Sequence, residues 1–283
     1  QKAFTTSFEG SVAYTYQHAV DVTSTTSSTA GSNYRYQRDV SGDINDKSVS
    51  TSKYDQPNRI IATGTYRFPK TLTDISVVYT GNSGAPFDYV YGIGSGTGSG
   101  DANADGQSQN DLIYVPKNAH DQSEILFTGY NSTNPQAVAA ANAMADGFEN
   151  LINRVDCLKS QRGTIMKRNS CRNPWVNEVD LTVAQNLGWR FNNLQVRFDI
   201  INFGNLLNKD WGKQAFSDQG ATCGQICSAT LPGLTQTGNK LPAGVTNSPL
   251  AQGIYTFDTK FTPFNSNFAA SNYRMQASVR YSF

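Results

Sequence analysis

The chain has little charge, few histidines and no long apolar run. Charged residues make up 16% of its 283 residues, below the roughly 25% of an ordinary soluble domain. The net charge of +1 provides no basic field for binding nucleic acid. No apolar run approaches the roughly 18 residues that a transmembrane helix needs. The residues after Gln1 do not form a signal peptide, so we expect a mature chain or a piece of a longer protein.

Signatures of catalysis are also missing. The two histidines, His18 and His120, have no serine or cysteine partner in a recognisable motif. The sequence contains no nucleophile elbow, no H-E-x-x-H zinc motif and no phosphate-binding loop. The sequence therefore predicts a protein that is not an enzyme.

The chain is instead rich in aromatic residues, which recur in alternating patterns. From Tyr273 to Phe283, apolar and polar residues alternate without exception, over a length near the roughly 9–11 residues of a transmembrane β-strand. A soluble antiparallel strand would alternate too. The aromatic end favours a membrane, because Tyr281 and Phe283 would lie in the interfacial girdle. A terminal Phe on the apolar face also resembles the C-terminal signal of outer-membrane barrels.

The same alternation recurs in five earlier segments. The predicted strands cover about residues 3–17, 58–68, 73–84, 177–188, 193–205 and 271–283. Two of the connections are tight turns, whereas segments 18–57, 85–176 and 206–270 are long and polar. Outer-membrane barrels have short periplasmic turns and long extracellular loops, and such loops also explain the mean hydropathy of -0.47. We therefore predict an all-β, antiparallel transmembrane β-barrel in the bacterial outer membrane, with the loops extracellular and the C-terminus periplasmic.

Six strands are too few to close a barrel. Bacterial barrels have at least about eight strands, and an open edge in lipid would leave backbone groups unpaired at high cost. We expect these strands to be the last part of a larger barrel, which the start of the first strand close to Gln1 favours. The alternative is that the long loops contain strands that the pattern does not reveal.

An acidic segment in the longest loop is similar to a calcium-binding loop. Its oxygen-bearing side chains are Asp101, Asn103, Asp105, Gln107 and Asp111, with a glycine at the expected sharp turn. Leu112 occupies the position where such a loop has an acidic residue, and no helices are expected to flank it. The alternative is an acidic surface turn before a strand at 112–115. Ca²⁺ is the only cofactor that the sequence suggests.

The same loop contains a predicted helix, a basic stretch and two of the four cysteines. Asn134 can cap a helix over 134–155, with proline at its first position. The stretch 154–172 is basic and either offers an outward surface to anions or is a solvated, disulfide-pinned loop. The cysteines form two close pairs, Cys157 with Cys171 and Cys223 with Cys227. We expect loop disulfides, because no histidine lies beside them to complete a zinc site.

Three loop segments carry a resemblance to a known family. They are "YTGNSGAPFDYVYG" around Phe87, "GDANADGQSQNDLIYVP" (Gly100 to Pro116) and "DCLKSQRGTIMKRNSCRNPW" (Asp156 to Trp175). With the strands "VDLTVAQNL", "LQVRFDIINFGNLLN" and "YRMQASVRYSF", they resemble the C-terminal barrel of Oar-like TonB-dependent receptors over most of residues 55–283. The resemblance implies a barrel of about 22 strands, of which these are the last six. It also implies an N-terminal plug domain and a TonB-type energy-coupling protein, but this sequence contains neither the plug nor the energy-coupling box.

Charged residues fall on the predicted inward side of the strands. They are Glu9, Arg67, Arg197, Asp199, Arg274 and Arg280. We expect them to line an aqueous lumen, where they either pair with the plug or keep the interior hydrated. The partners would be outer-membrane lipid, the rest of the barrel and plug, and the energy-coupling protein, with no nucleic acid.

Three functional hypotheses follow. The first is the barrel wall and extracellular loops of a TonB-dependent receptor for uptake or export of a large substrate. The second is a structural or adhesive surface protein without transport, which would have no plug domain. The third is a soluble all-β binding domain, which would be soluble without detergent.

Overall fold

A single antiparallel meander forms the largest element of the fold. The computed structural model describes residues 2–3, 6–25, 27–35, 45, 48–92, 110–187, 194–217, 229–231, 234–240 and 252–281. The sheet has seven strands in the order β1-β2-β5-β6-β13-β14-β20. They are β1 (Lys2–Ala3), β2 (Phe8–Tyr16), β5 (Asn58–Phe68), β6 (Thr73–Asn82), β13 (Val176–Asn186), β14 (Leu194–Ile201) and β20 (Arg274–Tyr281). Each strand pairs antiparallel with the next strand of the sheet along the chain.

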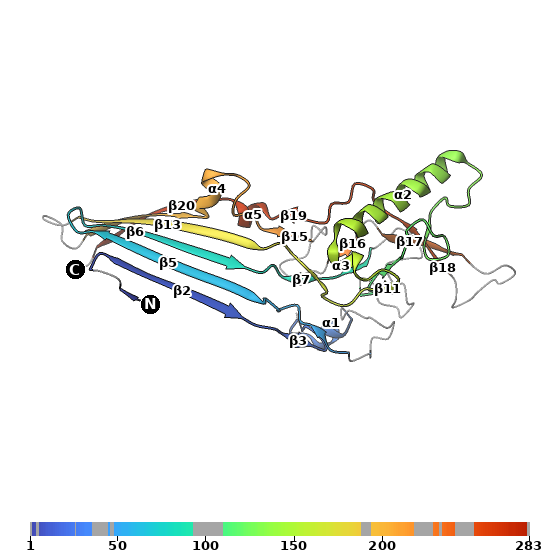
Figure 1. Cartoon of the computed structure of the whole chain (residues 1–283), viewed down its shortest axis with the longest axis horizontal. Helices are drawn as coiled ribbons and strands as arrows, with labels where there is room; N and C mark the ends of the chain where they lie inside the picture. The colour runs from blue at the N-terminus through green and yellow to red at the C-terminus, as the bar shows by residue number, and fades with distance from the viewer. Residues whose placement is uncertain are drawn as a thin grey trace.

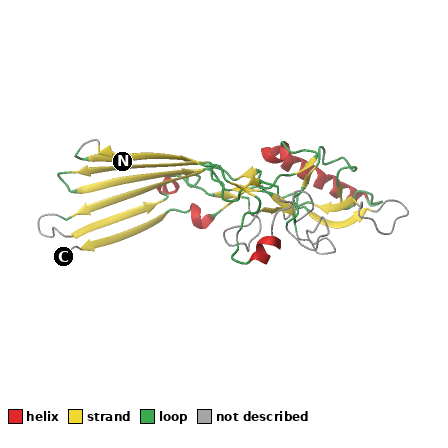
Figure 2. Ribbon diagram, turned by 90° about the horizontal axis from the view of Figure 1, so that it is seen from below, coloured by secondary structure: helices red, strands yellow, loops and turns green. Residues whose placement is uncertain are grey.

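The long strands lie side by side, and the connections differ at their two ends. Figure 1 shows the chain ends and the turn between β5 and β6 at one end of the strands, and most of the remaining helices and short strands at the other. Viewed from below, the flat array of strands is clearly distinct from the loop region (Figure 2). The predicted asymmetry of short and long connections is therefore present in the molecule. Within the described residues the sheet is open, with β1 and β20 at its edges.

Three predicted strand boundaries were wrong, each for a local reason. The predicted strand 3–17 begins instead at Phe8, because the chain reverses and β1 pairs back onto Glu9 and Gly10. The strand predicted to end at 205 ends at Ile201, because Asn202 has a φ of 55° and starts a short helix. The last strand begins at Arg274 rather than 271, because a helical turn precedes it. The strand predicted over 58–68 coincides with β5.

The long connections contain short strands and helices that do not join the main sheet. The short strands are β3 (Val20–Asp21), β4 (Ser50–Thr51), β7 (Pro86–Phe87), β8 (Tyr89–Tyr91), β9 (Tyr114–Val115), β10 (Leu126–Phe127), β11 (Thr164–Ile165), β12 (Cys171–Arg172), β15 (Ala215–Phe216), β16 (Ala229–Leu231), β17 (Thr235–Lys240), β18 (Gln252–Thr256) and β19 (Asn265–Ser266). The helices are α1 (Ala30–Arg35), α2 (Pro135–Arg154), α3 (Asp156–Lys159), α4 (Phe203–Leu207) and α5 (Phe268–Ser271). Pairs such as β8 with β16 and β10 with β18 join the second long connection to the third.

The long helix has the boundaries and cap that its sequence predicts. Asn134 is the N-cap, and its side chain accepts a hydrogen bond from the backbone N–H of Gln136 at 2.9 Å. Pro135 occupies the first turn, where its missing N–H costs nothing. One face of α2 is buried, through Ala141, Ala145, Phe148, Leu151 and Ile152. Among the helices in the described part of the chain, none has the length and hydropathy to cross a membrane.

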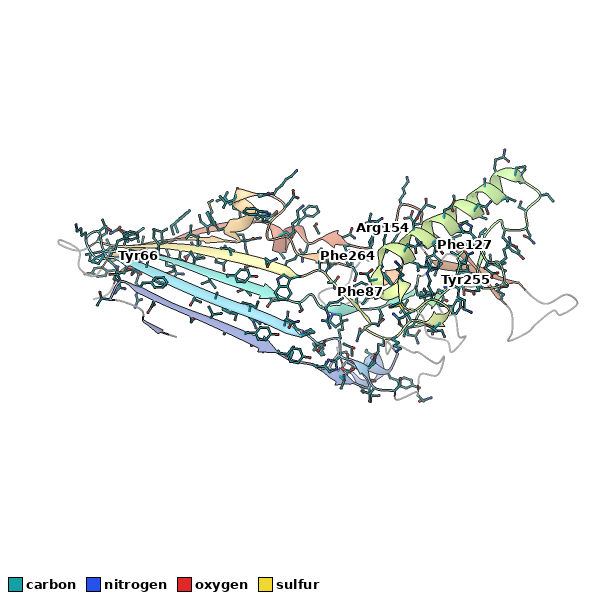
Figure 3. The ribbon with its side chains drawn as sticks, in the orientation of Figure 1. Tyr66, Phe87, Phe127, Arg154, Tyr255 and Phe264 are labelled. Atoms are coloured by element: carbon teal, nitrogen blue, oxygen red, sulfur yellow. A yellow bond between two sulfur atoms is a disulfide. The ribbon has the colours of Figure 1, made fainter. Side chains whose placement is uncertain are left out.

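The hydrophobic core lies in the loop region and not against the sheet. Apart from Ala184, the buried apolar residues of the described chain fall within 87–171 or at Leu234 and Phe257. Aromatic rings in edge or tilted contact run through this core from Phe264 to Phe127 (Figure 3). The three long connections thus form a loop region that has its own hydrophobic core. This core does not pack against the main sheet.

Candidate functional site: the faces and rim of the sheet

One face of the sheet is apolar from edge to edge. Because side chains alternate along a strand, residues paired across strands share a face. One such row consists of Phe8, Tyr66, Ile75, Val183, Phe198 and Ala277. Nothing in the described chain covers this face, and Val12 is 79% exposed while Val279 is 68% exposed. A water-soluble protein would bury such a face, whereas a transmembrane strand turns it to lipid.

The opposite face is polar over the same strands. The row next to the apolar one consists of Glu9, Thr65, Ser76, Thr182, Asp199 and Gln276. The face also balances its charges, with the basic residues Arg59, Arg67, Arg197, Arg274 and Arg280 and the acidic residues Glu9, Asp74, Glu178, Asp180 and Asp199. All six residues predicted to face a lumen lie here. That this face lines a lumen stays a prediction.

Several of these charges are paired within the wall. Arg67 binds Asp74 through two hydrogen bonds, from Nε at 2.8 Å and from Nη2 at 3.1 Å. Arg197 holds Asp199 through its Nε, at 2.8 and 2.9 Å from the two oxygens, and Thr182 donates to the same carboxylate at 2.5 Å. Thr182, Arg197 and Asp199 line a concavity of about 420 Å³ on this face. The polar face therefore presents polar side chains and internal ion pairs rather than an excess of charge of one sign.

Aromatic side chains mark the loop-side border of the apolar face. The hydroxyl of Tyr79 and the indole N–H of Trp175 both donate to Asn177 Oδ1, at 2.7 and 2.9 Å. Both rings lie over Gly81, where an added Cβ would be 2.5 Å from the Tyr79 hydroxyl. Such amphipathic rings with bonded polar tips are typical of a membrane interface. At the other border Tyr281 is 61% exposed on the apolar face, and the predicted terminal Phe283 lies outside the described residues.

Two arginines attach the loop region to the rim of the sheet. Arg172 donates to the Asp55 carboxylate at 2.6 Å and to the backbone carbonyl of Gly84 at 3.0 Å. Arg168 donates to Asp21 Oδ1 at 2.8 Å and to the carbonyl of Val22 at 2.6 Å. Asp55 is only 1% exposed. We call Arg168, Arg172, Asp21 and Asp55 the rim clamp.

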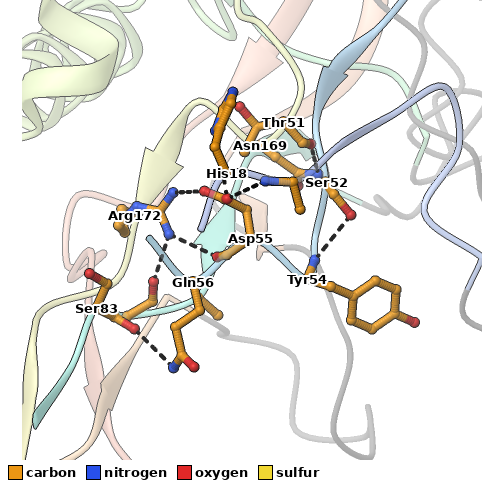
Figure 4. Close-up of polar contacts among 12 residues, drawn as sticks. His18, Thr51, Ser52, Tyr54, Asp55, Gln56, Ser83, Asn169 and Arg172 are labelled. Atoms are coloured by element: carbon orange, nitrogen blue, oxygen red, sulfur yellow. Dashed lines mark hydrogen bonds and ion pairs between the residues drawn. The ribbon is translucent and has the colours of Figure 1, made fainter. Parts of the chain in front are cut away.

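Neighbouring polar contacts complete the rim. Asp55 Oδ1 also accepts the backbone N–H of Ala19 at 2.7 Å and lies 3.7 Å from His18. Asn169 donates to the carbonyl of Thr51 at 2.8 Å. Figure 4 shows Asp55 between His18 and Arg172, with Asn169 nearby. These contacts therefore join the first long connection to the second at the rim of the sheet.

Three of the six basic residues in the stretch 154–172 are engaged in internal contacts, while Arg154, Lys159 and Lys167 are exposed. Arg168 and Arg172 are used in the rim clamp. Arg162 binds Glu149 of α2 at 2.5 Å and the carbonyl of Lys117 at 2.8 Å. Burial alone would raise the pKa of Glu149, but the hydrogen bonds and charge of Arg162 hold it below its ordinary value. The segment is pinned by its disulfide, and the binding of anions by its exposed basic residues stays a prediction.

The cysteine prediction is confirmed where the structure describes the residues. Cys157 and Cys171 form a disulfide that joins α3 to β12, and Cys171 is 1% exposed. The predicted pair of Cys223 and Cys227 lies outside the described residues.

Most of the predicted calcium loop is likewise outside the described chain. This applies to Asp101, Asn103, Asp105 and Gln107. Asp111 is described and lies 5% exposed beside β8, where its backbone carbonyl accepts the N–H of Tyr91.

The sequence did not indicate the rim clamp. Asp21 and Asp55 are isolated acids within a polar segment, more than a hundred positions from their arginines. A pairing across that distance leaves no periodic signal, so the sequence indicated a basic stretch but not the acidic partners of its arginines.

An amphipathic meander with one apolar and one polar face is typical of the wall of a transmembrane β-barrel. The family model "Outer membrane beta barrel domain" matches residues 1–236, and the chain belongs to this family. It is accordingly a protein of the bacterial outer membrane. No curated protein and no solved structure matches the chain.

Proposed function

We propose that the chain is the barrel wall and extracellular loops of a TonB-dependent outer-membrane receptor that moves a large substrate across the membrane. The observation that supports this most directly is that one face of the sheet is apolar and exposed while the opposite face is polar. A wall of this kind separates lipid from a water-filled passage. The resemblance of the segments around Phe87, 100–116 and 156–175 to Oar-like receptors favours this class over other barrels.

The open edges support a larger barrel. Strand β20 pairs only with β14 in the described chain, so the backbone groups on its other side require a further strand in lipid. In the proposed receptor, the remaining strands of a barrel of about 22 would pair with both edges. A plug domain would fill the lumen, and a TonB-type protein would supply energy through it.

The loop region also fits the second candidate, an adhesive surface protein without transport. Its own core and its clamp to the rim give it the rigidity that a binding surface needs.

Binding of Ca²⁺ by the segment 101–111 is part of either proposal, and calorimetric titration of the protein with Ca²⁺ tests it. If no binding heat were measured, the proposal that this segment binds Ca²⁺ would be wrong.

The native polypeptide, extracted in detergent from the outer membrane, distinguishes the candidates. A receptor predicts a mass well above the 30.8 kDa of this chain. It also predicts saturable binding of the purified periplasmic domain of a TonB-type protein. A large barrel that does not bind this domain would contradict the receptor and favour the adhesive surface protein. A folded barrel of 30.8 kDa would contradict both the receptor and the strand count.

A further inference from the structure

The first long connection contains a short strand pair, β3 with β4, whose two sides differ chemically. Val20 pairs with Thr51, and Asp21 pairs with Ser50. Because side chains alternate along a strand, Val20 and Thr51 leave one side of the pair while Asp21 and Ser50 leave the other. One side is therefore fully polar, and the other carries a valine.

The polar side of the pair is covered by the second long connection. Asp21 Oδ1 accepts a hydrogen bond from Arg168 Nη2 at 2.8 Å, and the Ser50 hydroxyl donates to the backbone carbonyl of Arg168 at 2.8 Å. Arg168 is only 5% exposed in this contact. The opposite side of the pair consequently points away from the second long connection.

This opposite side is apolar and uncovered. Val22 and Val49 lie two positions from Val20 and from its partner in β4, so alternation puts them on the same side as Val20. Val20 is 52% exposed, Val22 is 37% exposed and Val49 is 66% exposed. We call these three residues the valine face. Apolar side chains that are exposed as a group mark a contact surface more often than scattered ones do.

The valine face lies beyond the end of the membrane-spanning strand. Strand β2 ends at Tyr16, and the polar residues Gln17 and His18 separate it from β3. His18 belongs to the rim, 3.7 Å from Asp55. Figure 1 shows β3 past the end of β2, at the margin of the loop region. The hydrocarbon of the membrane therefore does not account for the valine face.

The strand below the valine face has an open edge. Strand β1 pairs only with Glu9 and Gly10 of β2. From Ser11 to Tyr16, β2 has a partner among the described strands only on its β5 side. In lipid such an edge requires a neighbouring strand, because its backbone groups have no water to bind. In the larger barrel, this strand extends the line of β1 as far as Tyr16.

The position of the next connection follows from the alternation of short and long connections. Strands β1 and β2 are joined by a short connection, between Ala3 and Phe8. The strand that extends β1 therefore has its other connection at the end of the sheet where the loops of such barrels are long. This loop leaves the sheet beside the first long connection, on the side away from the second.

We propose that the valine face is the docking surface for this neighbouring extracellular loop of the same polypeptide. Apolar side chains of that loop cover Val20, Val22 and Val49, while Asp21 and Ser50 remain bound to Arg168. The first long connection is then held from both sides. The inference rests on the larger barrel of the proposed function, but neither on transport nor on Ca²⁺.

Photochemical cross-linking in the full-length protein tests the occupant. With p-benzoylphenylalanine at position 49, irradiation should produce a cross-link to a peptide that precedes residue 1 of this sequence, identified by mass spectrometry. The same group at position 139, an exposed alanine of α2, is the control and should not form this cross-link. Both proteins must show heat-modifiable migration, which reports a folded barrel.

The intact mass of the same protein separates this inference from the proposed function. A mass well above 30.8 kDa, with cross-links from position 49 only to residues 1–283, only to a second copy or to nothing, would overturn the docking surface and leave the larger barrel in place. A mass of 30.8 kDa would overturn both.

A paired substitution tests the contact without a cross-linker. Lysine at an exposed position has little effect, whereas lysine in an apolar contact disrupts it. In the full-length protein, Val22→Lys with Val49→Lys should therefore raise hydrogen exchange several-fold within 19–25 and 48–55. Ile165→Lys, which changes a 43% exposed residue elsewhere in the loop region, should leave exchange in these segments unchanged. Exchange equal to wild type in the folded double variant would contradict the docking surface.

Discussion

Arg172 binds Asp55 twice, through the carboxylate at 2.6 Å and through the backbone carbonyl at 3.0 Å, across 117 positions of sequence. Asp55 is 1% exposed, and its other carboxylate oxygen accepts the backbone N–H of Ala19. The same arginine reaches the carbonyl of Gly84, beyond the end of β6. One side chain thus joins the first long connection, the second long connection and the rim of the sheet.

Replacing this arginine should loosen the loop region without unfolding the strands. Arg172→Met leaves the buried Asp55 carboxylate with only the Ala19 N–H and His18 beside it, which we expect to destabilise the loop region by roughly 2–3 kcal/mol, below the value for a fully buried pair because Arg172 is 31% exposed. Hydrogen exchange within 85–92 and 168–175 should rise. The exposed Arg154→Met is the matched control, and an equal rise in that variant would show that the pair has no special role.

Removing the disulfide should act on the same region. The Cys157–Cys171 bond closes a segment with a sequence separation of 14, for which chain entropy predicts a loss of about 3 kcal/mol. In Cys157→Ser with Cys171→Ser, proteolysis of the loop region should accelerate. The heat-modifiable migration of the barrel should persist, and its disappearance would mean that the strands depend on the loop core.

The contact between Glu149 and Arg162 predicts acid sensitivity in α2. Burial alone would raise the pKa of Glu149, but the hydrogen bonds from Arg162, Ala119 and Asn153 and the Arg162 charge hold it below its ordinary value of 4.5. A lowered folded-state pKa gives stability that is present above pH 4.5 and is lost as the pH falls through the folded-state pKa. Glu149→Gln should remove this component, about 1.5 kcal/mol at neutral pH. The measurement is hydrogen exchange in α2, corrected for intrinsic rates, between pH 7 and pH 3.

If wild type and Glu149→Gln lost protection in α2 equally over this range, the carboxylate would not be the origin of the acid sensitivity.

Two glycines of the apolar face should respond differently to alanine. At Gly81 an added Cβ would be 2.5 Å from the Tyr79 hydroxyl and 2.9 Å from Trp175, whereas at Gly64 the nearest atom is 3.9 Å away. Gly81→Ala should displace both rings and shift the emission of Trp175, measured with the other tryptophans replaced by Phe. Gly64→Ala should leave the emission unchanged. Identical spectra for the two variants would contradict the ring packing over Gly81.

The strands and their faces could be predicted because their signal is local. Alternation with a period of two is visible within about ten residues, and a slip of one residue would move every apolar side chain to the polar face. The cap at Asn134 is equally local, since the asparagine and the N–H that it binds are two positions apart.

The assembly of the loops could not be predicted, because it depends on distant pairings. Tyr89 and Phe261 meet in the core although they belong to different long connections. The end of β14 was missed because Asn202 adopts a left-handed conformation within an otherwise strand-like pattern.

The most direct measurement of the central claim is the environment of alternate residues on β13. Nitroxide labels at single cysteines replacing residues 179 to 184, in full-length protein reconstituted in vesicles and carrying Cys223→Ser and Cys227→Ser, report collisions with oxygen in lipid and with a nickel chelate in water. If β13 is part of such a wall, collisions with oxygen should be most frequent at residues 179, 181 and 183. Collisions with the nickel chelate should be most frequent at residues 180, 182 and 184. Nickel access to both sets, with no alternation, would contradict a wall between lipid and water.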